Sequence, residues 1–145
     1  MKLGRLSQKK GGDVATIRTT DTFTSALKEM NSRKIGSLVV LDEAGKVAGI
    51  LTERDLIINI DGYAKNSPVS EIMTPRAKLI LAKPDDVLEY AMSIFTEKRI
   101  RHLPVLDGEK LIGIVSIGDT VKELLDAAKE ENRHLKDYIL GQEIL

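Results

Sequence analysis

The second half of the chain repeats the first, and this duplication limits the possible folds more than any other sequence feature. Apolar residues recur 65 positions apart, pairing Ala26 with Ala91, Ile35 with Ile100, Leu38 with Leu103 and Val40 with Val105. Three later pairs lie 64 positions apart: Gly49 and Gly113, Thr52 and Ser116, Asp55 and Asp119. The one-residue slip falls where DEAGK faces DGEK, in a predicted turn that tolerates a deletion. The chain therefore holds two copies of one structural unit.

Each copy is predicted to contain a strand, a helix, two strands and a second helix. Extended segments at 14–18 and 78–83 come first. Helices follow with apolar residues at a spacing of 3.6, and we expect Asp21 and Asp85 to cap them. The runs SLVVL and HLPVL then lead through tight turns into VAGIL and LIGIV. One copy is too small to bury its helices, so we expect an α/β fold of two pseudo-symmetric repeats packed sheet to sheet.

The predicted organisation follows from these elements. It comprises an N-terminal arm at 1–12, the first repeat at 13–60, a surface linker at 61–74, the second repeat at 75–125 and a helical extension at 126–145. The linker is rich in Gly, Asn, Ser and Pro.

Composition excludes several function classes. Lys plus Arg and Asp plus Glu both number 22, so the formal net charge is zero and nothing favours nucleic acid as a partner. The chain has no cysteine and two histidines, so we expect no disulfide and no metal site. No signal peptide or membrane-spanning stretch is visible, which predicts a cytoplasmic location and no membrane partner. The motifs GxGxxG and GxxxxGK are also absent, and we expect no enzyme.

The motifs GILTERD and GIVSIGD, with SLVV and HLPV upstream, resemble those of the CBS domain pair, or Bateman module. The family motif is a Gly, two apolar residues, a Thr or Ser, two free positions and an Asp, and both copies match it. The resemblance covers roughly residues 13–125. The chain looks like the small stand-alone CBS-pair proteins of bacteria and organelles, with no fused catalytic or membrane domain. It implies a regulatory, signal-transducing or energy-sensing module whose ligand is AMP, ADP, ATP, NAD or S-adenosylmethionine.

Nucleotide binding needs residues of these types. An Asp at a helix start accepts hydrogen bonds from both ribose hydroxyls, and the Ser or Thr three residues earlier adds a hydroxyl. The following helix offers free backbone N–H groups to a phosphate. Arg99, Arg101 and His102 supply cations near a strand start.

The resemblance also implies that each binding cleft is composite, with residues from both repeats. The preferred site comprises Ala15, Thr16, Ile35, Gly36 and Ser37 facing Ser116, Ile117, Gly118 and Asp119, with Arg101 and His102 near the phosphate. A weaker site comprises Ile80, Leu81, Thr52, Arg54 and Asp55, again beside Arg101 and His102. We prefer the Asp119 site for an AMP-like ligand because Ala and Gly leave more room for a base than Ile80 and Leu81. No cofactor is expected beyond this regulatory ligand.

Each of these residues also has a purely structural interpretation. Asp55 and Asp119 are good helix N-caps, and Thr52 and Ser116 end strands. His102 is either a packed or a surface histidine, and Arg99 and Arg101 fit a solvated edge. Gly36 fits a turn. The recurrence of the same polar types in both copies favours the binding interpretation.

The C-terminal segment carries an apolar stripe at helical spacing, which comprises Val121, Leu124, Leu125, Ala128, Leu135, Tyr138 and Ile139. We expect this stripe to pack on a second chain and form a homodimer; the alternative is that it folds back on its own repeats. Besides the nucleotide-sensing module and the enzyme, a third function class remains, which is a docking or dimerisation module with vestigial ligand sites. The sequence does not identify a downstream protein target.

Overall fold

The computed structural model describes residues 1–11 and 13–144, the last three of these by their backbone. Residue 12 of the predicted arm and residue 145 of the predicted extension lie outside the described residues. The elements run in the order α1 (Leu3–Lys9), β1 (Thr16–Arg18), α2 (Phe23–Arg33), β2 (Ser37–Leu41), β3 (Val47–Thr52), α3 (Glu53–Ile58), α4 (Asp61–Lys65), α5 (Val69–Ile72), β4 (Thr74–Pro75), a 3₁₀ turn (Arg76–Lys78), α6 (Leu88–Lys98), β5 (His102–Asp107), β6 (Lys110–Ser116) and α7 (Ile117–Ile144).

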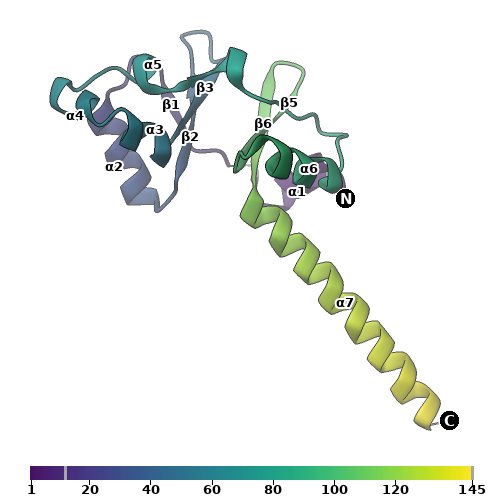
Figure 1. Ribbon diagram of the computed structural model, residues 1–145. Helices are drawn as coiled ribbons and strands as arrows, with labels where there is room; N and C mark the ends of the chain where they lie inside the picture. Colours follow the sequence, from purple (N-terminus) through teal and green to yellow (C-terminus); the bar gives the residue numbers. More distant parts are fainter. Residues whose placement is uncertain (12, 145) are drawn as a thin grey trace.

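The two repeats lie side by side, and the predicted α/β fold of two pseudo-symmetric repeats is confirmed (Figure 1). The first repeat holds a four-stranded sheet in the order β1-β2-β3-β4, with β1 parallel to β2 and the other pairs antiparallel. The second repeat holds the antiparallel pair β5-β6. A buried cluster joins the repeats, and it contains Val39, Val47 and Ile50 of the first with Leu106 of the second. Each repeat also has a core of its own under α2 or α6.

The extended segment predicted at 78–83 is shorter in the structure than its counterpart β1. Residues 76–78 form a 3₁₀ turn, and a single parallel bridge joins Ala82 to Val105. In the first repeat the Val39 amide donates to the Ala15 carbonyl at 3.0 Å. The equivalent position in the second repeat is Pro104, which has no amide hydrogen. The predicted segment does pair with β5, but the pairing is reduced to this one bridge, because Pro104 cannot donate the bond that Val39 donates in the first repeat.

The first helix of each repeat is capped differently from the prediction. The N-cap of α2 is Thr22, whose hydroxyl accepts the Ser25 amide, and the N-cap of α6 is Val87. Asp21 accepts the Arg18 amide at 2.9 Å and so closes the turn before the helix instead of capping it. Asp85 forms an exposed ion pair with Lys2. Both predicted aspartate N-caps are corrected, since the N-cap lies one residue after Asp21 and two residues after Asp85.

Helix α1 was not predicted, and it packs on β5 and β6 of the second repeat. Its Leu3 and Leu6 are buried in that repeat's core. The Leu3 amide donates to the Asp86 carbonyl at 2.8 Å, and the Val69 amide of α5 donates to the Asp21 carbonyl at 2.7 Å. Helices α1 and α5 thus dock in the same way on opposite repeats. The segments expected to be an arm and a linker each contribute a packing element.

Helix α7 runs without a break from the second repeat through most of the predicted extension, and Figure 1 shows it leaving the body of the protein. Its apolar stripe is exposed, with Leu125 at 55%, Leu135 at 56% and Ile139 at 54% of their full accessible surface. In the single chain the helix does not fold back on its own repeats.

Candidate functional site

Two short motifs, one in each repeat, hold the predicted ribose-binding aspartates at the junction between a strand and a helix. In the first, the Asp55 amide donates to the Thr52 hydroxyl at 3.2 Å, and the Thr52 amide donates to the Asp55 carboxylate at 2.9 Å. In the second, the corresponding distances between Ser116 and Asp119 are 3.1 and 2.8 Å. Both are capping boxes, in which the Thr or Ser is the N-cap and the Asp is the third helical residue. The expectation that the aspartates are themselves N-caps is corrected.

Each motif lies beside the loop that precedes the partner strand of its own repeat. Ser37 pairs with Thr52 across the β2-β3 ladder, and His102 pairs with Ser116 across β5-β6. The Glu53 amide donates to the Gly36 carbonyl, and the Ile117 amide donates to the Arg101 carbonyl, both at 3.0 Å. The structure therefore brings Gly36 and Ser37 to the first motif, and Arg101 and His102 to the second.

The other predicted site residues are spread over several elements of the two repeats. Ala15 and Ile35 are half-buried against the first repeat's core, while Thr16 is exposed. Ile80 packs on the second repeat's core, and Leu81 packs on the cluster between the repeats. Arg54, Ile117 and Gly118 are exposed on the first turns of α3 and α7. No hydrogen bond in the described chain joins Ala15, Thr16 or Gly36 to Ser116 or Asp119, so the composite cleft stays a prediction.

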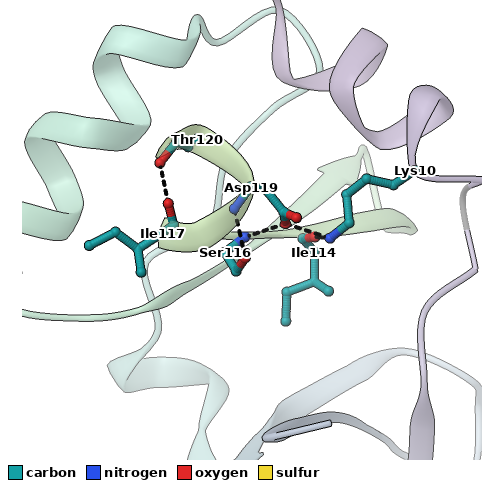
Figure 2. Close-up of polar contacts among 6 residues, drawn as sticks. All are labelled: Lys10, Ile114, Ser116, Ile117, Asp119 and Thr120. Carbon is teal, nitrogen blue, oxygen red and sulfur yellow. Dashed lines mark hydrogen bonds and ion pairs between the residues drawn. The ribbon is translucent and has the colours of Figure 1, made fainter. Parts of the chain in front are cut away.

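Lys10 is a site residue that sequence reasoning missed. Its ammonium group donates to Oδ2 of Asp119 at 2.6 Å and to the Ile114 carbonyl at 2.7 Å (Figure 2). Burial favours the neutral form of Asp119, but the hydrogen bonds from Lys10 and Ser116 outweigh burial and hold the pKa of this carboxyl below its usual value. One signal could have found Lys10: it lies 64 positions before Thr74, the same offset that relates the two aspartates.

Thr74 occupies the equivalent place at the first motif. Its hydroxyl donates to the Asp55 carboxylate, at 3.1 Å from Oδ1 and 3.3 Å from Oδ2. Both oxygens of Asp55 are therefore engaged by neutral groups. At Asp119, in contrast, Oδ2 accepts the Ser116 amide and the Lys10 ammonium, while Oδ1 accepts no hydrogen bond from the described residues.

His102 lies within the electrostatic reach of both repeats. Burial lowers the pKa of His102, and the positive charges of Lys10 and Arg101 lower it further. The carboxylates of Asp119 and of Glu53 in the first repeat act in the opposite direction but more weakly. The lowered pKa favours the neutral imidazole near pH 7, so His102 adds no positive charge to that of Lys10 beside Asp119.

A surface hollow of about 480 Å³ lies elsewhere, over α2, α3 and α4. Apolar side chains such as Leu27, Leu56 and Ile60 line it, and it contains none of the residues predicted to bind a nucleotide. The described residues include no group of three or more His, Cys, Asp or Glu that could hold a metal ion. Within the same part of the chain, no helix combines the length and apolar character needed to cross a bilayer.

The paired sheets, the reciprocal docking of α1 and α5, and one capping-box motif at each strand-to-helix junction define a duplicated α/β module. The chain belongs to the CBS domain family, whose model matches residues 9–62 and 69–126. Both matched segments contain one of the two motifs.

Relatives and solved structures agree with this assignment. The CBS domain-containing protein CBSX3, mitochondrial, from Arabidopsis thaliana is 41% identical over 128 residues, which are 85% of this chain and 62% of that protein. This chain therefore spans less than two thirds of the plant relative's length. A CBS-domain containing protein from Agrobacterium tumefaciens superposes with a TM-score of 0.78 at 36% identity, covering 85% of this chain and 98% of that one. The structure of CBSX2 in complex with AMP superposes with a TM-score of 0.71 at 25% identity, covering 79% and 90%.

Proposed function

We propose that this chain is a non-catalytic regulatory module that binds an adenine nucleotide of the AMP type at the Asp119 motif. The observation that carries the proposal is the state of the Asp119 carboxylate. Its side chain is 23% exposed, it is held in place by Ser116, and Oδ1 accepts no hydrogen bond from the described residues. A fixed carboxylate with a free oxygen suits the two hydroxyls of a ribose.

Two further observations support an adenine nucleotide. The structural neighbour CBSX2 was solved with AMP. Helix α7 begins at Ile117, next to the motif, and the positive end of its dipole suits an anion there. ATP, NAD and S-adenosylmethionine remain candidate ligands of the same class. No metal or cofactor is part of this proposal.

Calorimetric titration with AMP tests the proposal. We expect saturable binding by the parent protein and a loss of at least ten-fold in affinity for Asp119→Ala. Asp55→Ala is the matched control, because Asp55 occupies the same backbone position but has both oxygens engaged; it should keep most of the affinity. If AMP, ADP, ATP, NAD and S-adenosylmethionine all fail to bind the parent protein, the nucleotide-sensing function is wrong. Native mass spectrometry of the purified protein would identify a nucleotide that copurifies.

A second function, dimerisation through α7, is favoured by the exposed stripe on that helix. Leu124, Leu125, Leu135, Ile139 and Leu140 are each between 38% and 56% exposed. Burying such a stripe against a second copy removes apolar surface from water. Light scattering should find a dimer for the full chain and a monomer for a chain truncated after Leu125. If both are monomers, the homodimer is excluded.

A cytoplasmic location stays a prediction, since the name of the Arabidopsis relative places that protein in the mitochondrion.

A further inference from the structure

The ammonium group of Lys10 donates a hydrogen bond to the Asp119 carboxylate, the same group that is expected to bind a ribose. We propose that Lys10 is a specificity-determining residue of the Asp119 site and that it selects phosphorylated adenosine ligands over uncharged nucleosides. This inference rests on the proposed nucleotide-binding function and adds to it the residue that reads the ligand's phosphate.

The position of Lys10 is set by a firmly anchored element. Lys10 directly follows α1, whose Leu3 and Leu6 are 0% and 2% exposed in the core of the second repeat. The backbone amide of Lys10 also donates to the Leu6 carbonyl at 3.1 Å. Because Lys10 is the residue immediately after α1, the docking of this helix places the ammonium group at the Asp119 motif.

The ion pair itself is accessible and can be rearranged. The Lys10 side chain is 35% exposed and that of Asp119 is 23% exposed, so water reaches both groups. A pair of this kind contributes little to stability because solvent screens it. A ligand can therefore separate Lys10 from Asp119 at small cost, provided that the ammonium group finds another anion.

Ribose binding creates that need. When two ribose hydroxyls donate to the Asp119 carboxylate, they compete with Lys10 for its oxygens, of which Oδ2 already accepts the Ser116 amide at 2.8 Å. An ammonium group has three donors, and Lys10 uses one on Asp119 and one on Ile114. A phosphate on the same ligand accepts the displaced donor and neutralises its charge. A nucleoside without a phosphate weakens the contact of Lys10 with Asp119 and supplies no other anion to the ammonium group.

The first motif lacks this device. Thr74 takes the place of Lys10 there, and a hydroxyl carries no charge to be compensated. Selection for a phosphate is therefore a property of the Asp119 site and not of the duplicated motif as such.

The test compares AMP with adenosine by calorimetric titration on the parent protein and on Lys10→Met, Lys10→Arg and Lys9→Met. We expect Lys10→Met to weaken AMP binding at least ten-fold and to leave adenosine binding within about three-fold. Lys10→Arg should restore most of the preference for AMP. Lys9→Met is the matched control, because Lys9 is the adjacent lysine but pairs with Glu123 at 2.6 Å, and it should keep the parent's preference.

The ratio of the two affinities decides the matter. If Lys10→Met changes AMP and adenosine binding by the same factor, Lys10 only competes with the ligand or supports the fold, and the inference is wrong while the proposed function stands. If the parent protein binds neither ligand, the proposed function and this inference both fail. The AMP affinity of Lys10→Met should also depend less on salt than that of the parent, a readout that a purely structural role would not change.

Discussion

The two capping-box motifs share one backbone geometry but differ in the group that contacts the aspartate from outside. At Asp55 this group is the neutral hydroxyl of Thr74, and at Asp119 it is the ammonium of Lys10. The reciprocal bonds between Thr52 and Asp55, and between Ser116 and Asp119, agree within about 0.1 Å. Both copies therefore keep the capping box that begins the helix, but they differ in the charge of the residue that contacts the aspartate. The fold of such a module therefore does not determine its ligand.

The same contrast extends to the segments that lie against the two sheets, β4 in the first repeat and α1 in the second. Gly49 and Gly113 are equivalent glycines in β3 and β6, and each has a docked segment directly against it. A β-carbon at Gly49 would lie 2.4 Å from the Thr74 carbonyl oxygen, whereas one at Gly113 would lie 2.5 Å from the Ser7 hydroxyl. Backbone of the β4 strand faces the first glycine, and a side chain of α1 faces the second.

Alanine at these glycines should give the largest effects. We expect Gly49→Ala to lower the free energy of unfolding by about 3 kcal/mol, because the β3-β4 ladder itself must shift. Gly113→Ala should cost less, about 1–2 kcal/mol, since the nearest atoms there belong to the Ser7 side chain and no strand ladder must shift. Urea unfolding measures both. Gly141→Ala is the control, because open space surrounds a β-carbon there and the exposed helix favours alanine. Equal losses at Gly49 and Gly113 would contradict the distinction between the two contacts.

Removing the capping hydroxyls should show where the two motifs are alike. Thr52→Ala and Ser116→Ala should each lower the free energy of unfolding by about 1 kcal/mol, because each leaves an N-terminal amide of a helix without its acceptor. Thermal unfolding provides the measurement, with Thr16→Ala as a control at an exposed threonine outside any cap. A loss at only one position would mean that the motifs are not energetically equivalent.

The ion pair at Asp119 should contribute less than either cap. Lys10→Met is expected to lower the free energy of unfolding by about 0.5 kcal/mol, since both side chains are partly exposed and solvent screens the charges. The loss should shrink further in high salt. Unfolding in urea at two salt concentrations checks this expectation. A loss above about 2 kcal/mol would show that Lys10 is a structural residue first.

The smallest expected effect is the dependence of stability on pH. It arises from His102, whose equivalent in the first repeat, Ser37, does not titrate. Because the pKa of His102 is lowered by burial, Lys10 and Arg101, the unfolded chain binds a proton more readily than the folded chain. Stability from this group is present above the unfolded value of about 6.5 and is lost as the pH falls toward the folded pKa. His102→Gln should flatten the unfolding profile between about pH 7.5 and 5. Lys10→Met should raise the pKa of His102, which nuclear magnetic resonance can follow.

Much of the fold was predictable because it depends on local patterns that occur twice. The 3.6 spacing around Ala26 and Ala91 and the β-branched runs predicted helices and strands that the structure contains. The reduced strand pairing at 78–83 depends on Pro104, more than 20 residues away, and no local pattern at 78–83 reports it. Helix α1 escaped prediction for a similar reason, since its apolar residues are covered by the second repeat and not by their neighbours in sequence.

The candidate site likewise combines contacts that are local in sequence with contacts between distant residues. Thr52 with Asp55, and Ser116 with Asp119, are three residues apart, so their contact was readable from spacing. Lys10 lies 109 residues from Asp119, and its role follows from the docking of α1. The opposition of Gly36 to Asp119 across the two repeats depends on inter-repeat geometry, and it stays a prediction.

The length of α7 connects the Asp119 motif to a point far from it in space. A helix of 28 residues at 1.5 Å per residue is about 42 Å long, and Asp119 belongs to its first turn. A tilt of about 5° at that turn displaces the far end by about 4 Å, roughly the width of a side chain. A rotation of α7 about its first turn would therefore be largest at the far end of the helix, although it would begin as a small shift beside Asp119.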